Sequence, residues 1–394
     1  MIKNNRTILI IALIALVNML GYGIIIPILY SYSKKYGLSD FENGLLFASF
    51  SVCQFISTPI IGRLSDKYGR RPLLIMSIAG TAVSFFMMAF APSAIFLLLA
   101  RMLDGLTAGN IPVAFAVISD STKPQDRAKA FGYISSAFNF GFVFGPAIAA
   151  LTVNWNPAIP FIIAGVITII AALLTIFYLP ETNTHMGEVK GGKLFDFKHI
   201  WHALFNSQLS TLFASTLIFF MAFACALIYG FQPFAINILH VTASQNAYLF
   251  TLFGTIGLIS QTFLVARFSK RLGMKKAFTQ SLLLTAIAFL IMFISRSIPV
   301  FIIGCIVLAL ANSVVQTLFP TILSMESDPK SQGSVMGLNT SYQSIGMIVG
   351  PILGGAIATL SIPMPFLAGA ILVLICFFLS FRILRGAVKP ESAF

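Results

Sequence analysis

Apolar stretches long enough to cross a lipid bilayer recur along most of this sequence. A transmembrane helix needs about 20 mostly apolar residues. Twelve stretches meet this need, at residues 7–31, 43–61, 72–91, 94–118, 130–152, 158–179, 210–232, 247–266, 277–295, 300–324, 334–359 and 366–384. Lipid offers no partners to bare backbone groups, and the strands of membrane barrels are short and alternating. The sequence therefore predicts an all-α membrane protein with twelve transmembrane helices.

The composition of the 394 residues supports a membrane environment. Hydrophobic residues make up 58% of the chain and charged residues 9%, whereas soluble domains carry roughly 25% charged residues. So few charges cannot cover a water-facing surface of this size. We therefore expect the lipid bilayer to be a partner, and we expect neither a soluble enzyme nor a nucleic-acid-binding protein.

The basic residues are unevenly distributed between the two ends of the predicted helices. Of the 25 Lys and Arg residues, 21 lie near the termini or in the loops that follow even-numbered stretches. Lys34, Lys35 and Arg296 lie on the other side, and Arg101 lies inside a stretch. Because basic loops mark the cytoplasmic side, we expect both termini in the cytoplasm and a multi-pass location in the cytoplasmic (inner) membrane. The formal net charge of +13 then orients the helices.

The sequence repeats itself at an offset of about 204–205 residues. The segment 62–71 aligns with 266–275, and 141–146 aligns with 346–351. Two related halves predict a pseudo-symmetric bundle with a binding site near the membrane midplane between them. The expected organisation is a six-helix bundle at 1–180, a cytoplasmic linker at 181–209 and a second six-helix bundle at 210–394.

The loop after the second stretch carries a motif that is similar to the signature of the major facilitator superfamily. The resemblance to this superfamily covers nearly the whole chain. The pattern G-x-L-x-D-x-x-G-R-R is matched at Gly62, Leu64, Asp66, Gly69, Arg70 and Arg71. The segment 141–146, with Gly141, Gly145 and Pro146, is similar to a motif of the antiporters in that superfamily. The resemblance implies the major facilitator fold and a transport activity.

Two further segments, 101–110 and 179–182, are similar to the drug-efflux branch of that superfamily. The resemblance implies a member of the twelve-span drug:proton antiporter family, which contains tetracycline and multidrug exporters. Two positions depart from the pattern of that family. Asn18 stands where those exporters usually have Asp, and Ala149 and Ala150 replace a usual glycine pair.

Arg101 and Asp104 are the ionisable residues that lie deep inside a predicted helix. Charged groups in the membrane are costly and usually serve a function. Their spacing places both on one helix face. We predict that Asp104 carries a coupling proton, with Arg101 modulating it. Two alternatives are a fixed, mutually neutralising pair and, because the acid at position 18 is missing, a protein without proton coupling.

Uncharged polar residues recur at helical spacing within the stretches. A mostly apolar cavity with a few polar groups suits an amphipathic ligand. The alternative is that these groups are interhelical hydrogen-bond partners, worth about 0.6–2 kcal/mol each. We predict substrate binding by Asn18, Tyr22, Asn110, Asn139, Tyr229, Gln232, Asn312, Gln316, Asn339 and Gln343.

The loop motif also predicts a gate. Asp66 can sit at the N-terminus of a neighbouring helix, where a carboxylate is favoured, and Arg70 can bridge to Asp120. The resemblance implies that such a network locks the halves in an outward-open state; the alternative is simple anchoring by positive charge. The predicted gating residues are Gly62, Asp66, Gly69, Arg70, Arg71, Asp120, Gly141, Gly145 and Pro146.

No catalytic, metal-ligating or cofactor-binding pattern is found. The four cysteines all lie in apolar stretches without a C-x-x-C pair, which favours buried packing. We therefore expect a monomeric non-enzyme without cofactor that exports an apolar or amphipathic small molecule by alternating access, with proton antiport. The alternatives are a metabolite or sugar exporter or facilitator without proton coupling, and a non-transporting receptor or scaffold on the same fold.

Overall fold

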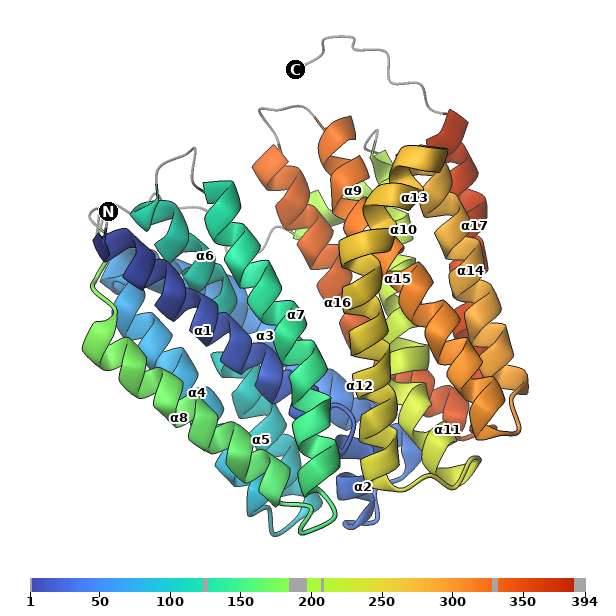
Figure 1. Ribbon diagram of the computed structural model, residues 1–394, viewed down its shortest axis with the longest axis horizontal. Coiled ribbons are helices and arrows are strands. Elements are labelled where there is room, and N and C mark those ends of the chain that lie inside the picture. Colours follow the sequence, from blue (N-terminus) through green and yellow to red (C-terminus); the bar gives the residue numbers. More distant parts are fainter. Residues whose placement is uncertain (1, 123–126, 184–196, 207–208, 328–331, 386–394) are drawn as a thin grey trace. The chain divides into compact units, whose positions relative to one another are not determined.

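The computed structural model describes residues 2–122, 127–183, 197–206, 209–327 and 332–385. These residues form helices and connecting turns, and no strand is found among them (Figure 1). Twelve of the described helices are long and apolar enough to cross a membrane. The predicted all-α class and number of spans are confirmed. Residues 184–196 and 207–208 of the predicted linker lie outside the described residues.

The first half of the chain supplies six of the spans. Its helices are α1 (Ile2–Ile25), α2 (Leu29–Lys34), α3 (Asp40–Tyr68), α4 (Arg70–Ala89), α5 (Ala94–Thr107), α6 (Asn110–Ser121), α7 (Arg127–Thr152) and α8 (Ile159–Tyr178). The fourth span consists of α5 and α6 together. The first helix ends at Ile25, before the end of the predicted stretch 7–31, because Pro27 has no N–H to continue the helical bonds.

The second half supplies the other six spans. Its helices are α9 (Phe197–Asn206), α10 (Ser210–Phe223), η1 (Ala224–Gly230), α11 (Phe231–Asn237), α12 (Ala243–Ile259), η2 (Ser260–Leu264), α13 (Val265–Leu272), α14 (Met274–Ile294), α15 (Ile298–Glu326), α16 (Gln332–Ala358) and α17 (Met364–Arg385). The seventh and eighth spans each contain a π-helical segment, η1 and η2. Such segments inside α-helices are frequent at functional sites.

The expected loop at 62–71 is almost entirely helical. The helix α3 continues to Tyr68 and α4 begins at Arg70, so Gly69 alone separates them. Gly69 has φ +104°, and Gly273, at the same place in the repeat, has φ +80°. Glycine adopts such values at little cost. The apolar pattern marks where the helix leaves the lipid, but the helix itself continues as a polar segment beyond that point.

The chain groups into two compact units. One contains Met1–Leu194 with His240–Gly254, and the other contains Phe195–Leu239 with Thr255–Phe394. The beginning of α12 therefore belongs with the first unit, where the Asn246 amide donates a hydrogen bond to the Pro27 carbonyl at 2.6 Å. The division into bundles at 1–180 and 210–394 stays a prediction.

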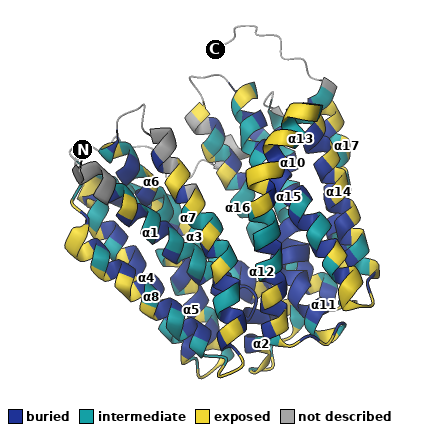
Figure 2. Cartoon of the chain, in the orientation of Figure 1, coloured by how far each residue is buried: buried dark blue, intermediate teal, exposed yellow. Residues whose placement is uncertain are grey.

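Within each unit, buried residues face neighbouring helices and large apolar residues remain on the outside (Figure 2). Phe177 and Phe378, for example, are 73% and 65% exposed. Extensive exposed apolar surface would be unfavourable in water. Together with the twelve spans, this surface describes a multi-pass membrane protein.

Candidate functional site

A buried ion pair lies in α5 of the first unit. Arg101 Nη1 is 3.0 Å from Asp104 Oδ2, and the two residues are 1% and 6% exposed. The next residue, Gly105, allows α5 to approach α3, because a side chain there would collide with the Phe50 carbonyl and the Cys53 side chain. The pair is therefore enclosed between closely packed helices, where charge interactions are strong.

An aromatic side chain from α3 completes the surroundings of this pair. The Arg101 guanidinium lies 4.6 Å from the centre of the Phe50 ring, which is cation–π distance. Tyr22 of α1 also packs against the Phe50 ring, with the two ring centres 6.2 Å apart. Arg101 Nε is buried without a hydrogen-bond partner. The sequence alone does not single out Phe50 among 39 phenylalanines.

Two predicted substrate-binding residues of the first unit contact each other directly. Asn110, at the start of α6, donates from Nδ2 to Asn18 Oδ1 on α1 at 2.9 Å. Asn18 lies one helical turn before Tyr22, so α1 places both on one face. Asn18 Nδ2 is buried without a partner. Asn139 lies half-buried on α7 in the same unit. We call Asn18, Tyr22, Phe50, Arg101 and Asp104 the α1–α5 cluster.

The remaining predicted substrate-binding residues lie in the second unit. Asn339 of α16 is buried and accepts a hydrogen bond from the Thr216 hydroxyl of α10 at 2.9 Å. The sequence did not indicate Thr216 as its partner. The other five lie on η1, α11, α15 and α16. Tyr229 and Gln232 are buried in η1 and α11, Asn312 is buried and Gln316 exposed on α15, and Gln343 is half-buried on α16.

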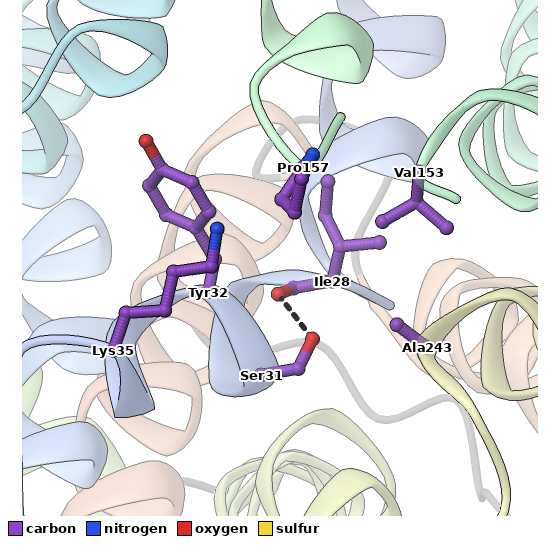
Figure 3. Close-up of a pocket in the computed structure, with 7 residues that line it drawn as sticks. All are labelled: Ile28, Ser31, Tyr32, Lys35, Val153, Pro157 and Ala243. Carbon is purple, nitrogen blue, oxygen red and sulfur yellow. Dashed lines mark hydrogen bonds between the residues drawn. The ribbon is translucent and has the colours of Figure 1, made fainter. Parts of the chain in front are cut away.

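A separate small cavity of about 120 Å³ lies in the first unit, beside α2. Figure 3 shows its lining residues, which are Ile28, Ser31, Tyr32, Lys35, Val153, Pro157 and Ala243. None of the predicted substrate-binding residues is among them. Drug-sized ligands occupy pockets of roughly 300–1,000 Å³, so this cavity does not match the predicted cavity in size or position.

A second polar cluster lies where α3 turns into α4. Arg70 Nε is 3.2 Å from Asp120 Oδ2 at the end of α6, and Nη1 donates to Ser65 Oγ at 2.8 Å. Nη1 also contacts Asp66, one turn earlier on α3. The structure thus places Arg70 against Asp120, the partner expected from the sequence. Asp66, which was expected at the N-terminus of a neighbouring helix, contacts the Arg70 guanidinium.

The carboxylate found at a helix N-terminus in this cluster is Glu181, which the sequence analysis did not single out. Glu181 accepts hydrogen bonds from the backbone N–H groups of Arg70 and Arg71. Burial raises the pKa of Glu181, but these bonds and those from Thr182 and Asn183 outweigh it and lower the pKa below its ordinary value. Its carboxylate is therefore ionised at neutral pH. The available signal was its place in the segment 179–182.

The predicted gating glycines differ in what they contact. Gly141 and Gly145 bring α7 onto the backbone of α1, where a Cβ at Gly145 would lie 2.8 Å from Gly23 Cα. Pro146 also faces Gly23. By contrast, a Cβ on Gly62 would meet nothing within 4 Å. Packing therefore explains the first three and not Gly62.

The described residues contain no group of three or more His, Cys, Asp or Glu side chains that could hold a metal ion. All four cysteines are buried and free.

A family model described as Major Facilitator Superfamily matches residues 11–273 and 214–394. Multidrug resistance protein 1 of Bacillus subtilis (strain 168) is 30% identical over 92% of each chain. Tetracycline resistance protein, class B, of Escherichia coli is 27% identical over 89% of this chain and 88% of its own. Quinolone resistance protein NorA of Staphylococcus aureus (strain Mu50 / ATCC 700699) is 27% identical over 90% and 92%.

Solved structures with the same fold have lower sequence identity. A bacterial homologue of the human lysosomal transporter Spinster is 18% identical, with a TM-score of 0.79 over 99% of both chains. The nucleoside transporter NupG is 13% identical, with a TM-score of 0.79 over 96% of this chain and 99% of its own. These similarities concern the fold alone.

Proposed function

This chain belongs to the Major Facilitator Superfamily, and from that premise we propose that it is a secondary active exporter of amphipathic small molecules, driven by proton antiport. Membership of a transporter family is established by the match over both halves. The direction of transport, the substrate class and the proton are parts of the proposal.

The observation that carries the proposal is the buried pair of Arg101 and Asp104. A carboxylate enclosed by helices and facing a guanidinium at 3.0 Å is costly to keep charged in a membrane. Protonation of Asp104 would remove that charge and release Arg101. We propose that substrate binding and protonation of Asp104 exclude each other, so that outward movement of substrate accompanies inward movement of a proton.

The substrate class is inferred from the surroundings of the pair and from the relatives. The α1–α5 cluster combines two aromatic rings with an amide, a hydroxyl and an ion pair, which suits a largely apolar molecule with a few polar groups. Several similar proteins are named for resistance to tetracycline, quinolones or several drugs. We propose that the amides in the second unit, including Asn339, also bind substrate.

We further propose that the two six-helix bundles at 1–180 and 210–394 alternate in access, with the cytoplasmic loops and both termini on the basic side of the cytoplasmic membrane. Inverted or repeated bundles around a central site commonly work in this way. Arg70 bridging α3 and α6 is the proposed gate element of the first bundle.

Asn18 favours a second candidate function. The exporters that the sequence resembles have an acid at this place, and its absence here fits a facilitator of metabolites or sugars that moves substrate without protons. The non-transporting receptor or scaffold has no specific observation in its favour.

Reconstitution distinguishes these candidates. Purified protein in liposomes with an imposed pH gradient is offered tetracycline, ethidium and a panel of sugars, while internal pH and substrate are recorded. Substrate-dependent proton movement is expected. Substrate flux that is independent of the pH gradient would support the facilitator and contradict proton antiport. Absence of flux for every compound would contradict transport of drug-like molecules and of sugars.

Variants of the ion pair test the role of Asp104. We expect Asp104→Asn to abolish proton-driven transport while ethidium binding remains measurable, and Asp104→Glu to retain coupling. Because an unpaired buried Arg101 costs about 3–5 kcal/mol, the double variant Arg101→Gln with Asp104→Asn is the folded reference. Glu42→Gln, an exposed acid outside the site, is the control. Unchanged proton-driven transport in Asp104→Asn would refute the role.

A further inference from the structure

The first turn of α4 is capped by a carboxylate from the far end of the first six helices. Glu181 accepts hydrogen bonds from the N–H of Arg70 at 2.9 Å and of Arg71 at 3.0 Å, one on each oxygen. The first N–H groups of a helix have no partner inside it, and Pro72, which follows, has no N–H. Gly69, the residue before α4, supplies no side-chain cap. Glu181 therefore satisfies the first two N–H groups of this helix.

The residues after Glu181 bind the helix on the other side of the turn. Asn183 Nδ2 donates to the Asp66 carbonyl at 2.8 Å, in the last turn of α3. The backbone N–H groups of Thr182 and Asn183 return to Glu181 Oε1, each at 2.9 Å. Since Gly69 alone separates α3 from α4, the segment 181–183 is bonded to both sides of this connection.

Arg70 is the first residue of α4 and projects its side chain from this turn. Its guanidinium reaches Asp120 on α6 and Ser65 and Asp66 on α3, and it is only 13% exposed. A guanidinium presents its donors in a rigid, planar fork, so the bridge depends on where the Arg70 backbone is held. We propose that Glu181 is a positioning residue for Arg70, which it holds in the geometry that bridges α3 to α6. This inference rests on the proposed function, because that bridge is the proposed gate.

The second half of the chain has the same turn with a lysine bridge in place of the guanidinium, since Lys275 Nζ lies 2.7 Å from Glu326 Oε1 at the end of α15. Lys275 Nζ donates to a carbonyl of α17 at 3.0 Å, as Arg71 Nη2 donates to a carbonyl of α8 at 2.5 Å. Met274 stands where the repeat has Arg70, and α14 begins without a side-chain cap from the preceding residue. The basic contact to the last helix of the half and an ion pair to the end of the fourth span of the half are therefore common to both turns. The first turn differs in that the bridge is made by the guanidinium of the first helical residue, whose backbone N–H is held by Glu181.

Substitution of Glu181 tests the inference in proteoliposomes, with ethidium or tetracycline as the transported probe. We expect Glu181→Ala to lower the maximal rate about tenfold with little change in KM, because the gate is affected and the binding cluster is not. Glu181→Gln keeps one acceptor for the two N–H groups and should fall in between. Thr182→Val is the matched control, since the Thr182 hydroxyl is buried without a partner.

A double-mutant cycle separates positioning from simple stabilisation. If Glu181 acts through the Arg70 side chain, Glu181→Ala has no further effect on rate in an Arg70→Ala background, although the backbone cap is still lost there. An equal fall in both backgrounds would overturn the inference.

The same cycle on melting temperatures does not depend on transport. Coupling between Glu181 and Arg70 in melting is expected whether or not the wild-type protein moves a probe. Coupling in melting temperature with no wild-type flux would contradict the proposed function and support the positioning role of Glu181. Wild-type flux with additive losses in melting temperature and in rate would support the proposed function and contradict the positioning role.

Discussion

Asn18 is the residue at which this chain departs most clearly from the exporters it resembles. The structure shows it as the acceptor of a 2.9 Å hydrogen bond from Asn110, with its own Nδ2 buried and without a partner. A carboxylate has the same shape as the amide and accepts the same bond. The local packing therefore does not demand an amide here, and the difference from the exporters concerns proton chemistry.

The substitution Asn18→Asp tests that reading. We expect a folded protein, because the bond from Asn110 persists and the buried donor without a partner disappears. We expect transport to depend more steeply on the imposed pH gradient, because a second carboxyl group within the membrane spans can bind a proton. Proton and substrate fluxes measured in the same vesicles give the ratio of the two. Asn18→Ala, which loses the bond, is the control, and a ratio unchanged from wild type would contradict the expectation.

At the scale of whole helices, glycine faces decide which spans approach each other most closely. Gly141 and Gly145 of α7 lie against the backbone of α1, and Gly346 and Gly350 of α16 lie against α10 and η1 in the same way. Small residues four apart permit such contact in membranes. The repeated motif therefore produces the same close helix pair in each half, and packing alone accounts for its spacing.

Overpacking this contact should destabilise the protein. In Gly145→Ala the new methyl group would lie 2.8 Å from Gly23 Cα and from the Leu20 carbonyl, so the backbones must separate. We expect a loss of about 1–3 kcal/mol, seen as a lower melting temperature in detergent. Gly132→Ala on the same helix is the control, because its methyl group would meet nothing within 4 Å. Equal melting of the two variants would show that the α1–α7 contact yields without cost.

At the scale of the whole molecule, the distribution of basic residues predicts how the chain sits in the membrane. The described helices provide twelve spans, and an even number returns the chain to the side from which it started. The excess of Lys and Arg on that side favours the cytoplasm. The predicted orientation therefore follows from the distribution of charge.

Cysteine labelling tests the orientation directly. The four natural cysteines are buried, so a membrane-impermeant maleimide should react little with the wild-type protein in intact cells. We expect Asn156→Cys, in the exposed turn between α7 and α8, to be labelled from outside. Lys67→Cys, at the exposed end of α3, should be labelled only after the cells are permeabilised. The opposite pattern would invert the predicted topology.

The sequence by itself determined the number of spans, the repeat and the family, because these follow from apolar length and from motifs that are local in the chain. It also indicated Arg101, Asp104 and the contact between Arg70 and Asp120. Only the tertiary structure decided the partners that come from distant segments. Phe50 beneath Arg101, Asn110 beside Asn18 and Glu181 at the start of α4 are brought together by helix packing. The periodicity of the sequence does not predict which helix faces contact each other. The contacts of a single phenylalanine or glutamate with distant residues therefore depend on the tertiary structure.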